Sequence, residues 1–123
     1  MEKVNLAQKL SLFNDPFSPK IIGEVNDLHV KVVKLQGEFV WHHHDVEDEL
    51  FFVVKAALKM KVREGGSERE IVILPGEFLI IPHDVEHCPS ADEETHIMLL
   101  EPKSTLNTGN VENERTVHEL QRI

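Results

Sequence analysis

The spacing of apolar residues changes once along the chain, from a helical period to a strand period. Near the N-terminus, Leu6, Leu10 and Phe13 recur at intervals of four and three residues, which places them on one face of an α-helix. Asn5 is suited to cap this helix, and an Asn-Asp-Pro sequence after Phe13 ends it. We therefore expect a helix over residues 5–13.

From about residue 20 the pattern is that of short strands separated by turns. Leu58, Met60 and Val62 alternate with basic residues, as in a strand with one buried face. The run 50–54 is apolar at every position and is expected to be buried on both faces. The apolar phase shifts within 28–36, which indicates a β-bulge. The expected strands cover residues 20–25, 28–36, 39–44, 50–54, 58–63, 69–74, 77–81 and 95–101.

This succession of short strands favours an all-β sandwich or barrel over a fold of alternating strands and helices. The barrel is expected over about 20–101, within one domain of residues 1–123. The tail, 102–123, is expected to begin as a polar loop and to close with a short helix over 116–123. The N-terminal helix would lay its apolar face on the barrel or on a partner chain.

Charge and cysteine content narrow the choice of partners. The net charge is −9 with histidine neutral, and an acidic protein repels the phosphate backbone of nucleic acids. No apolar run reaches the ~18 residues of a membrane span, and the first residues lack a signal-peptide pattern. The single cysteine, Cys88, is expected to be a buried apolar group. These features predict a cytoplasmic protein that binds neither nucleic acid nor membrane.

A dense group of ionisable residues interrupts the strand pattern. Of the nine residues 41–49, three are histidines and four are acids. Because alternate side chains of a strand share a face, His42 and His44 would point together and His43 away from them. Imidazole and carboxylate groups are common ligands of divalent transition metals. A solvated polar loop explains such a group about equally well, so the pattern alone leaves both interpretations open.

The carboxylate that would complete a metal site has more than one candidate. Glu49 opens the strand that follows the acidic loop, so it can return to the same end of the barrel. Glu47 is the competing carboxylate, and Asp48 is a weaker third. A distant histidine, His87, follows a Pro-His-Asp turn that leads into a further short strand.

Two motifs in this region resemble those of the cupin superfamily. The first cupin motif runs Gly, five residues, His-x-His, three or four residues, Glu, six residues, Gly. Gly37, His42, His44 and Glu49 match it, with four residues rather than five after the glycine. Ala56 stands where the closing glycine is expected, in a turn where a positive φ would cost alanine ~1 kcal/mol.

The second cupin motif runs Gly, five residues, Pro-x-Gly, two residues, His, three residues, Asn. Gly76, Pro82 and His87 match it at the right spacing. Asp84 replaces the middle glycine, which is a mild change because aspartate tolerates positive φ. Ala91 replaces the asparagine, which puts any role of that asparagine in doubt.

The resemblance implies a double-stranded β-helix, or jelly-roll barrel, around one divalent transition metal (Fe, Zn, Mn or Ni). It implies that the metal ligands are His42, His44, Glu49 and His87. Residues 100–110 also look like a stretch of small single-domain cupins, a group that includes proteins labelled mannose-6-phosphate isomerase-like. That label follows the fold and not the pocket. A phosphosugar pocket would need inward Arg or Lys, which the strand pattern does not provide.

Four protein ligands would leave one or two positions on an octahedral ion for water or a small-molecule ligand. The candidates for a catalytic acid or base near such a position are Glu47, His83 and His96. His96 shares a strand face with Met98 and Leu100, so we expect it to point inward. His83 sits at a turn and is expected to be solvated.

Two classes of function remain open. The first is a divalent-metal-dependent enzyme acting on a small molecule, of the oxygenase or isomerase type. The second is a non-catalytic barrel in which the metal is structural or sensory. A homodimer is expected in either class, because edge strands and the N-terminal helix need cover, and an outward Trp41 would suit its interface. The remaining histidines, His29, His43 and His118, are expected at the surface or an interface.

Overall fold

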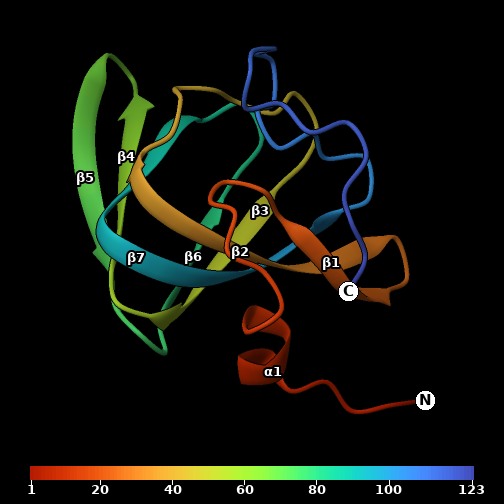
Figure 1. Cartoon of the computed structure of the whole chain (residues 1–123). Helices are drawn as coiled ribbons and strands as arrows, with labels where there is room; N and C mark the ends of the chain where they lie inside the picture. Colours follow the sequence, from red (N-terminus) through yellow and green to blue (C-terminus); the bar gives the residue numbers. More distant parts are fainter.

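The computed structural model describes residues 1–123, and its strands form an antiparallel jelly-roll (Figure 1). Along one path the strand order is β1-β2-β7-β3-β6, while β4 pairs with both β5 and β7. The elements are α1 (Leu6–Leu10), β1 (Lys20–Val25), β2 (Leu28–Glu38), β3 (Glu49–Lys55), β4 (Leu58–Glu64), β5 (Ser67–Ile73), β6 (Phe78–Ile81) and β7 (Glu86–Pro102). The expected all-β fold is confirmed.

The long strand β7 ties the two parts of the structure together. Its first residues pair with β4, and its second half lies between β2 and β3. The sequence pattern predicted a short strand after the turn before His87 and a separate strand over 95–101, because Pro89 and the polar residues 92–94 interrupt the apolar alternation. The continuous strand matters for the site, since it carries His87 at one end and Glu101 at the other.

The barrel interior is filled by one side of each strand. On β4, Leu58, Met60 and Val62 are at most 2% exposed, which confirms the alternation seen in the sequence. On β3, Phe51 and Val53 are buried, while the residues between them are only half-buried. We expected both faces of β3 to be fully buried, but only one face is, and the other is half-buried. The main cluster consists of Val33, Leu35, Phe51, Val53, Leu58, Met60, Val62, Ile73, Ile81, Ala91, Ile97 and Leu99.

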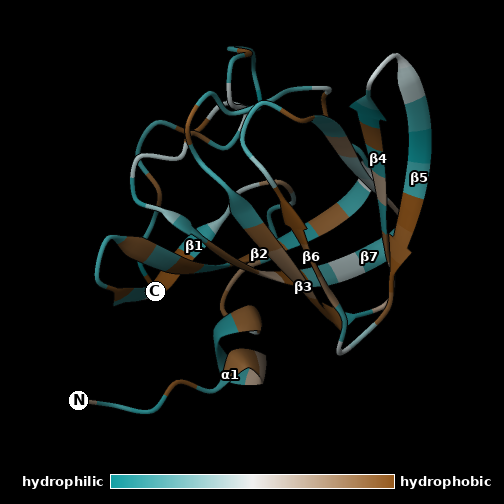
Figure 2. Ribbon diagram, turned by 180° about the vertical axis from the view of Figure 1, so that it is seen from behind, coloured by the Kyte–Doolittle hydropathy of each residue, from teal (hydrophilic) through white to brown (hydrophobic).

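The short helix covers the outer face of the sheet rather than its interior (Figure 2). Leu10 and Phe13 pack on Val32 in a second, smaller cluster. Asn5 caps the helix by accepting a hydrogen bond from the backbone N–H of Gln8. The helix ends at Leu10, so the expected span of 5–13 is too long, although Phe13 still packs where the helical period placed it.

The expected closing helix over 116–123 is wrong. The last residues instead run beside the edge strand β1, with a parallel bridge between Ile21 and Arg122 (Figure 1). The backbone N–H of Ile21 donates to Gln121, and the N–H of Ile123 donates back to Ile21. The exposed edge of β1 offers the tail these hydrogen bonds, which a helix would forgo.

The expected strand 39–44 is also absent as a regular element. Near the end of β2, Gly37 has a φ of +89°, and beyond Glu38 the chain makes single hydrogen bonds to several neighbours. Phe39 donates to the carbonyl of Pro89, and His42 exchanges two hydrogen bonds with His87. The bulge expected within 28–36 appears at its end, where the β2–β7 register shifts between Leu35 and Gly37.

Two turn residues have the positive φ that the cupin motifs led us to expect. Ala56 and Asp84, which stand where cupins have glycine, have φ values of +68° and +67°. Both positions therefore keep the left-handed backbone although neither carries a glycine. No helix in this chain has the length and apolar character needed to span a membrane.

Candidate metal centre

Four side chains meet inside the barrel. His42, His44, Glu49 and His87 each offer a ligand atom, and these atoms all lie within 4.8 Å of one another. All four residues are at most 5% exposed. The two motif histidines lie on the extended segment after β2, Glu49 begins β3, and His87 is the second residue of β7. Three separate segments of the fold therefore converge on one point.

The carboxylate of Glu49 lies at the centre of this group. Its Oε1 is 2.8 Å from Nε2 of His44 and 3.1 Å from Nε2 of His87. The rings of His42 and His87 have centroids 4.3 Å apart, as the backbone bridge between these residues dictates. Glu47 is not part of the group, so the structure brings together the carboxylate preferred from the sequence.

Backbone carbonyls fix the orientation of two of the rings. Nδ1 of His42 lies 2.9 Å from the carbonyl of Val40, and Nδ1 of His87 lies 2.8 Å from that of Val85. A carbonyl only accepts, so in each ring Nδ1–H is the donor and Nε2, without a proton, is left facing the cluster, where it could bind a metal. Burial, together with the neighbouring His87, lowers the pKa of His42 to about 4, so its ring is neutral near pH 7.

The group has an unsatisfied atom that a metal ion would satisfy. Nε2 of His44 is buried and has no hydrogen-bond partner, despite its short distance to Glu49. Buried polar nitrogens without partners are rare in folded proteins. Burial alone would raise the pKa of Glu49, but Glu101 and the two histidines lower it well below its usual range. Three imidazoles and one carboxylate fit Fe, Mn, Ni or Zn.

The sequence analysis missed a second buried carboxylate, Glu101. It is 2% exposed, and its Oε1 accepts a hydrogen bond from Nζ of Lys31 at 2.7 Å. Its Oε2 is buried without a partner. Burial and the neighbouring charge of Glu49 raise the pKa of Glu101 well above its usual range. The inward phase of Ile97 and Leu99 was the signal that could have placed it.

Lys31 was missed because the phase of β2 was misjudged. Leu28, Val30 and Val32 alternate with His29 and Lys31, and the change of phase at Val33 and Leu35 was interpreted as a bulge. Lys31 is 1% exposed and His29 is 9% exposed, so the surface alternative of the position expected for His29, at the surface or an interface, is wrong. The opposite face of β2 is also covered, by α1, which explains why Val32 is buried as well.

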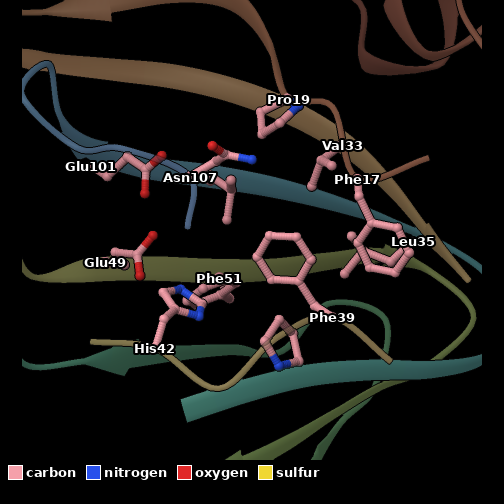
Figure 3. Close-up of a pocket in the computed structure, with 12 residues that line it drawn as sticks. Phe17, Pro19, Val33, Leu35, Phe39, His42, Glu49, Phe51, Glu101 and Asn107 are labelled. Carbon is pink, nitrogen blue, oxygen red and sulfur yellow. The ribbon is translucent and has the colours of Figure 1, made fainter. Parts of the chain in front are cut away.

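An apolar pocket opens beside the metal-ligand group (Figure 3). Figure 3 places Glu49, Glu101 and His42 toward one end and Phe17 and Leu35 toward the other. The space between the lining side chains is about 440 Å³, part of which is open to solvent. The lining residues are Phe17, Pro19, Val33, Leu35, Phe39, His42, Glu49, Phe51, Pro89, Leu99, Glu101 and Asn107.

The other candidate catalytic residues point elsewhere. His96 lies on the face of β7 opposite Ile97 and Leu99, with Nε2 3.0 Å from Glu94, so its expected inward direction is wrong. In this part of β7 the inward residues are Ile97, Leu99 and Glu101. His96 shares the other face with Met98 and Leu100. Glu47 accepts a hydrogen bond from Ser104 on the outside.

Three more residues from the motif region lie at the surface or near it. His83 is exposed, as expected, and contacts Asp48 at 2.9 Å. His43 points away from the cluster and contacts Asp45. Trp41 does not present a free outer face, because the guanidinium of Arg63 lies 3.7 Å from its ring centroid.

The loop after β7 holds the histidine segment from the outside. The backbone N–H of His43 donates to Oδ1 of Asn110, and the N–H of Asn110 donates to the carbonyl of His43. A Cβ added at Gly109 would overlap that carbonyl oxygen and lie 3.0 Å from the ring of His42. The loop therefore holds the backbone of His43, which lies between the two converging histidines His42 and His44.

Comparison with known proteins shows which family this chain belongs to. The family model for 3-hydroxyanthranilic acid dioxygenase matches residues 3–119. A 3-hydroxyanthranilate 3,4-dioxygenase of Ruegeria pomeroyi is 30% identical over 93 residues, which are 75% of this chain and 52% of that protein. One of Nematostella vectensis is 31% identical over 91 residues, which are 74% of this chain and 34% of that protein.

A solved structure supports the same placement. A cupin-2 domain protein of Shewanella frigidimarina is 44% identical, with a TM-score of 0.77 over 81% of this chain and 94% of that one. This chain spans about half the length of the Ruegeria relative and a third of the Nematostella one. By its matching model, its motifs and its barrel, the chain is a small cupin and belongs to the 3-hydroxyanthranilic acid dioxygenase family.

Proposed function

We propose that this protein is a metal-dependent oxygenase that adds both atoms of O₂ to a small aromatic substrate. The observation that carries the proposal is that the buried His42–His44–Glu49–His87 group opens directly onto an apolar pocket. A structural metal site is closed by its ligands, whereas a catalytic one keeps a position for substrate. Family membership favours the oxygenase type over the isomerase type.

Each part of the pocket has a role in this proposal. The three histidines and Glu49 hold one divalent metal, with iron favoured by the family, and the metal supplies the chemistry that activates O₂. Phe51 and Leu99 exclude water from the ring of the substrate. Of the polar wall groups outside the ligand set, Glu101 has a buried oxygen without a partner, so it orients a substrate hydroxyl or amino group. The amide of Asn107 is bonded to the backbone of Arg115 and Val117. Because both oxygen atoms enter the substrate, no external reductant is needed.

An oxygen-consumption assay tests the proposal. Protein is reconstituted with Fe(II) without oxygen and then exposed to catechol, 2-aminophenol, hydroquinone and 3-hydroxyanthranilate, with thiols and β-diketones as further classes. We expect at least one to consume one O₂ per substrate. The His87→Ala variant should be inactive, whereas His83→Ala, which alters an exposed histidine outside the cluster, should keep the activity. Absence of O₂ uptake with every compound would refute the oxygenase.

The alternative is a non-catalytic barrel in which the metal is structural or sensory. One observation favours it: outside the ligand set, only Glu101 and Asn107 give the pocket wall polar groups. In that case metal would raise the melting temperature, but no small ligand would raise it further. A ligand-dependent rise in the metal-loaded protein would favour the enzyme.

A homodimer and a cytoplasmic location remain predictions. The dimer is supported by β6, which ends the strand order and has one neighbour, and by the exposed side chains of Phe78 and Ile80 on it. Apolar side chains on an edge strand favour association with a second copy. Sedimentation of wild-type protein and of a Phe78→Ser/Ile80→Ser variant would test this, with a dimer expected only for the wild type.

A further inference from the structure

The charges around the pocket limit the ligands that can enter it. Two lining residues, Glu49 and Glu101, are acids, and no lysine or arginine lines the pocket. The remaining wall is almost entirely aromatic and aliphatic. A negatively charged group placed on that wall would lose its hydration without gaining a cation.

Two cations that contact lining residues, Lys31 and Arg115, are both engaged elsewhere. Nζ of Lys31 is bonded to Glu101, and the residue is 1% exposed. The guanidinium of Arg115 lies over the ring of Phe17, 4.4 Å from its centroid, and its Nη1 donates to the carbonyl of Glu38. Arg115 thus stacks on a wall residue and is not itself part of the lining.

The curated relatives are named for 3-hydroxyanthranilate, an aminophenol ring that carries a carboxylate. We propose that the ligand of this pocket is instead an uncharged hydroxylated or amino-substituted aromatic ring without a carboxylate. This inference rests on the proposed function for the role of the site, and it specifies the substrate class. The apolar wall takes the ring, and the partnerless oxygen of Glu101 takes a protic substituent.

Two pairs of compounds test the inference, because the members of each pair differ only by a carboxylate. They are 2-aminophenol against 3-hydroxyanthranilate, and catechol against 2,3-dihydroxybenzoate. Binding is measured by calorimetry on full-length protein loaded with Zn²⁺, which does not react with O₂. The hydroxyl and amino groups are the same within a pair, so the comparison reports on the carboxylate alone. We expect the neutral member to bind at least tenfold more tightly.

Two variants change the charge of the wall. Glu101→Gln removes an acid and releases Lys31 from its ion pair, so the preference for the neutral ring should fall at least tenfold. Phe39→Arg adds a cation at a half-buried wall position that contacts His42 edge-on, and it should shift the preference in the same direction. If Glu101→Gln does not fold because Lys31 has lost its partner, Phe39→Arg still tests the inference.

The outcomes separate this inference from the proposed function. Equal or tighter binding of the carboxylated rings to wild-type protein, or binding of neither member, would overturn the inference. Tight binding of neutral rings with no O₂ uptake by the Fe(II) protein would refute the oxygenase and leave the ligand class standing. Unchanged preference in both variants, when both are folded, would also overturn the inference.

Discussion

Lys31 and Glu101 form an ion pair inside the barrel, with Nζ 2.7 Å from Oε1 and side-chain exposures of 1% and 2%. The pair joins the inner faces of β2 and β7 next to the metal-ligand group. Burying two charges is costly, and removing one partner leaves the other uncompensated. The pair is therefore a sensitive point of the structure as well as part of the pocket wall.

A double-mutant cycle measures this pair. Lys31→Met and Glu101→Gln should each destabilise the protein by ~3–5 kcal/mol, because each leaves a buried polar group without its partner. The double variant should cost less than the sum of the two. Urea unfolding monitored by tryptophan fluorescence checks the expectation. Additive effects would mean that the two side chains do not interact as the distance indicates.

His44 and His43 are adjacent but differ in role. His44→Ala should lower the affinity for a divalent metal by at least tenfold and abolish most of the metal-dependent rise in melting temperature. His43→Ala is the matched control, since its ring contacts Asp45 outside the cluster. Thermal unfolding with and without added Zn²⁺ distinguishes them. An equal loss of metal affinity in both variants would contradict the conclusion that His44 points into the cluster and His43 away from it.

Gly109 supports the histidine segment through its lack of a side chain. Gly109→Ala should destabilise the protein and weaken metal binding, because its Cβ would displace the carbonyl of His43. Gly65→Ala is the control: its φ of +56° is close to the +55° of Gly109, but nothing lies within 4 Å of an added Cβ. The control should cost ~1 kcal/mol and leave the metal affinity unchanged. Metal titration of both variants checks this, and equal metal affinities would argue against the supporting role of the loop.

The lowered pKa of His42 has a consequence for the metal-free protein. Burial first, and then the neighbouring His87, lower it from 6.5 to about 4. The unfolded chain then binds a proton more readily than the folded one. Because His42 must be neutral in the folded protein, its contribution to the free energy of unfolding is fully present above about pH 6.5 and is lost as the pH falls toward 4. The free energy of unfolding should fall by about 3 kcal/mol over this range. Unfolding in EDTA at several pH values should show this slope, and His42→Gln should reduce it. An unchanged slope in the variant would refute the assignment.

Much of the fold could be predicted from the sequence, because it depends on local alternation. The buried face of β4 follows directly from Leu58, Met60 and Val62. The face of β2 could not be read in the same way, since the interior covers one side and α1 the other. An apolar pattern on both sides leaves the direction of Lys31 undetermined until the partners of the strand are known.

The members of the metal-ligand group could be predicted because their spacing matches known motifs. Glu101 lies fourteen positions after the last of them, outside the two motifs that contain the ligands, and the resemblance of residues 100–110 to small cupins assigned it no role. Its inward direction depends on the register of a 17-residue strand, of which only part was identified. The contact between Asn110 and His43 joins segments 67 positions apart and involves loops without periodicity, so no sequence pattern points to it.

Elemental analysis of protein purified without added metal or chelator, combined with the same measurement on Glu49→Gln and His43→Ala, tests the central claim most directly. We expect one transition-metal ion per wild-type chain, retained in His43→Ala and lost from Glu49→Gln. Wild-type protein that holds no metal, and binds none with micromolar or better affinity when Fe(II), Mn(II), Ni(II) or Zn(II) is added, would contradict the metal centre.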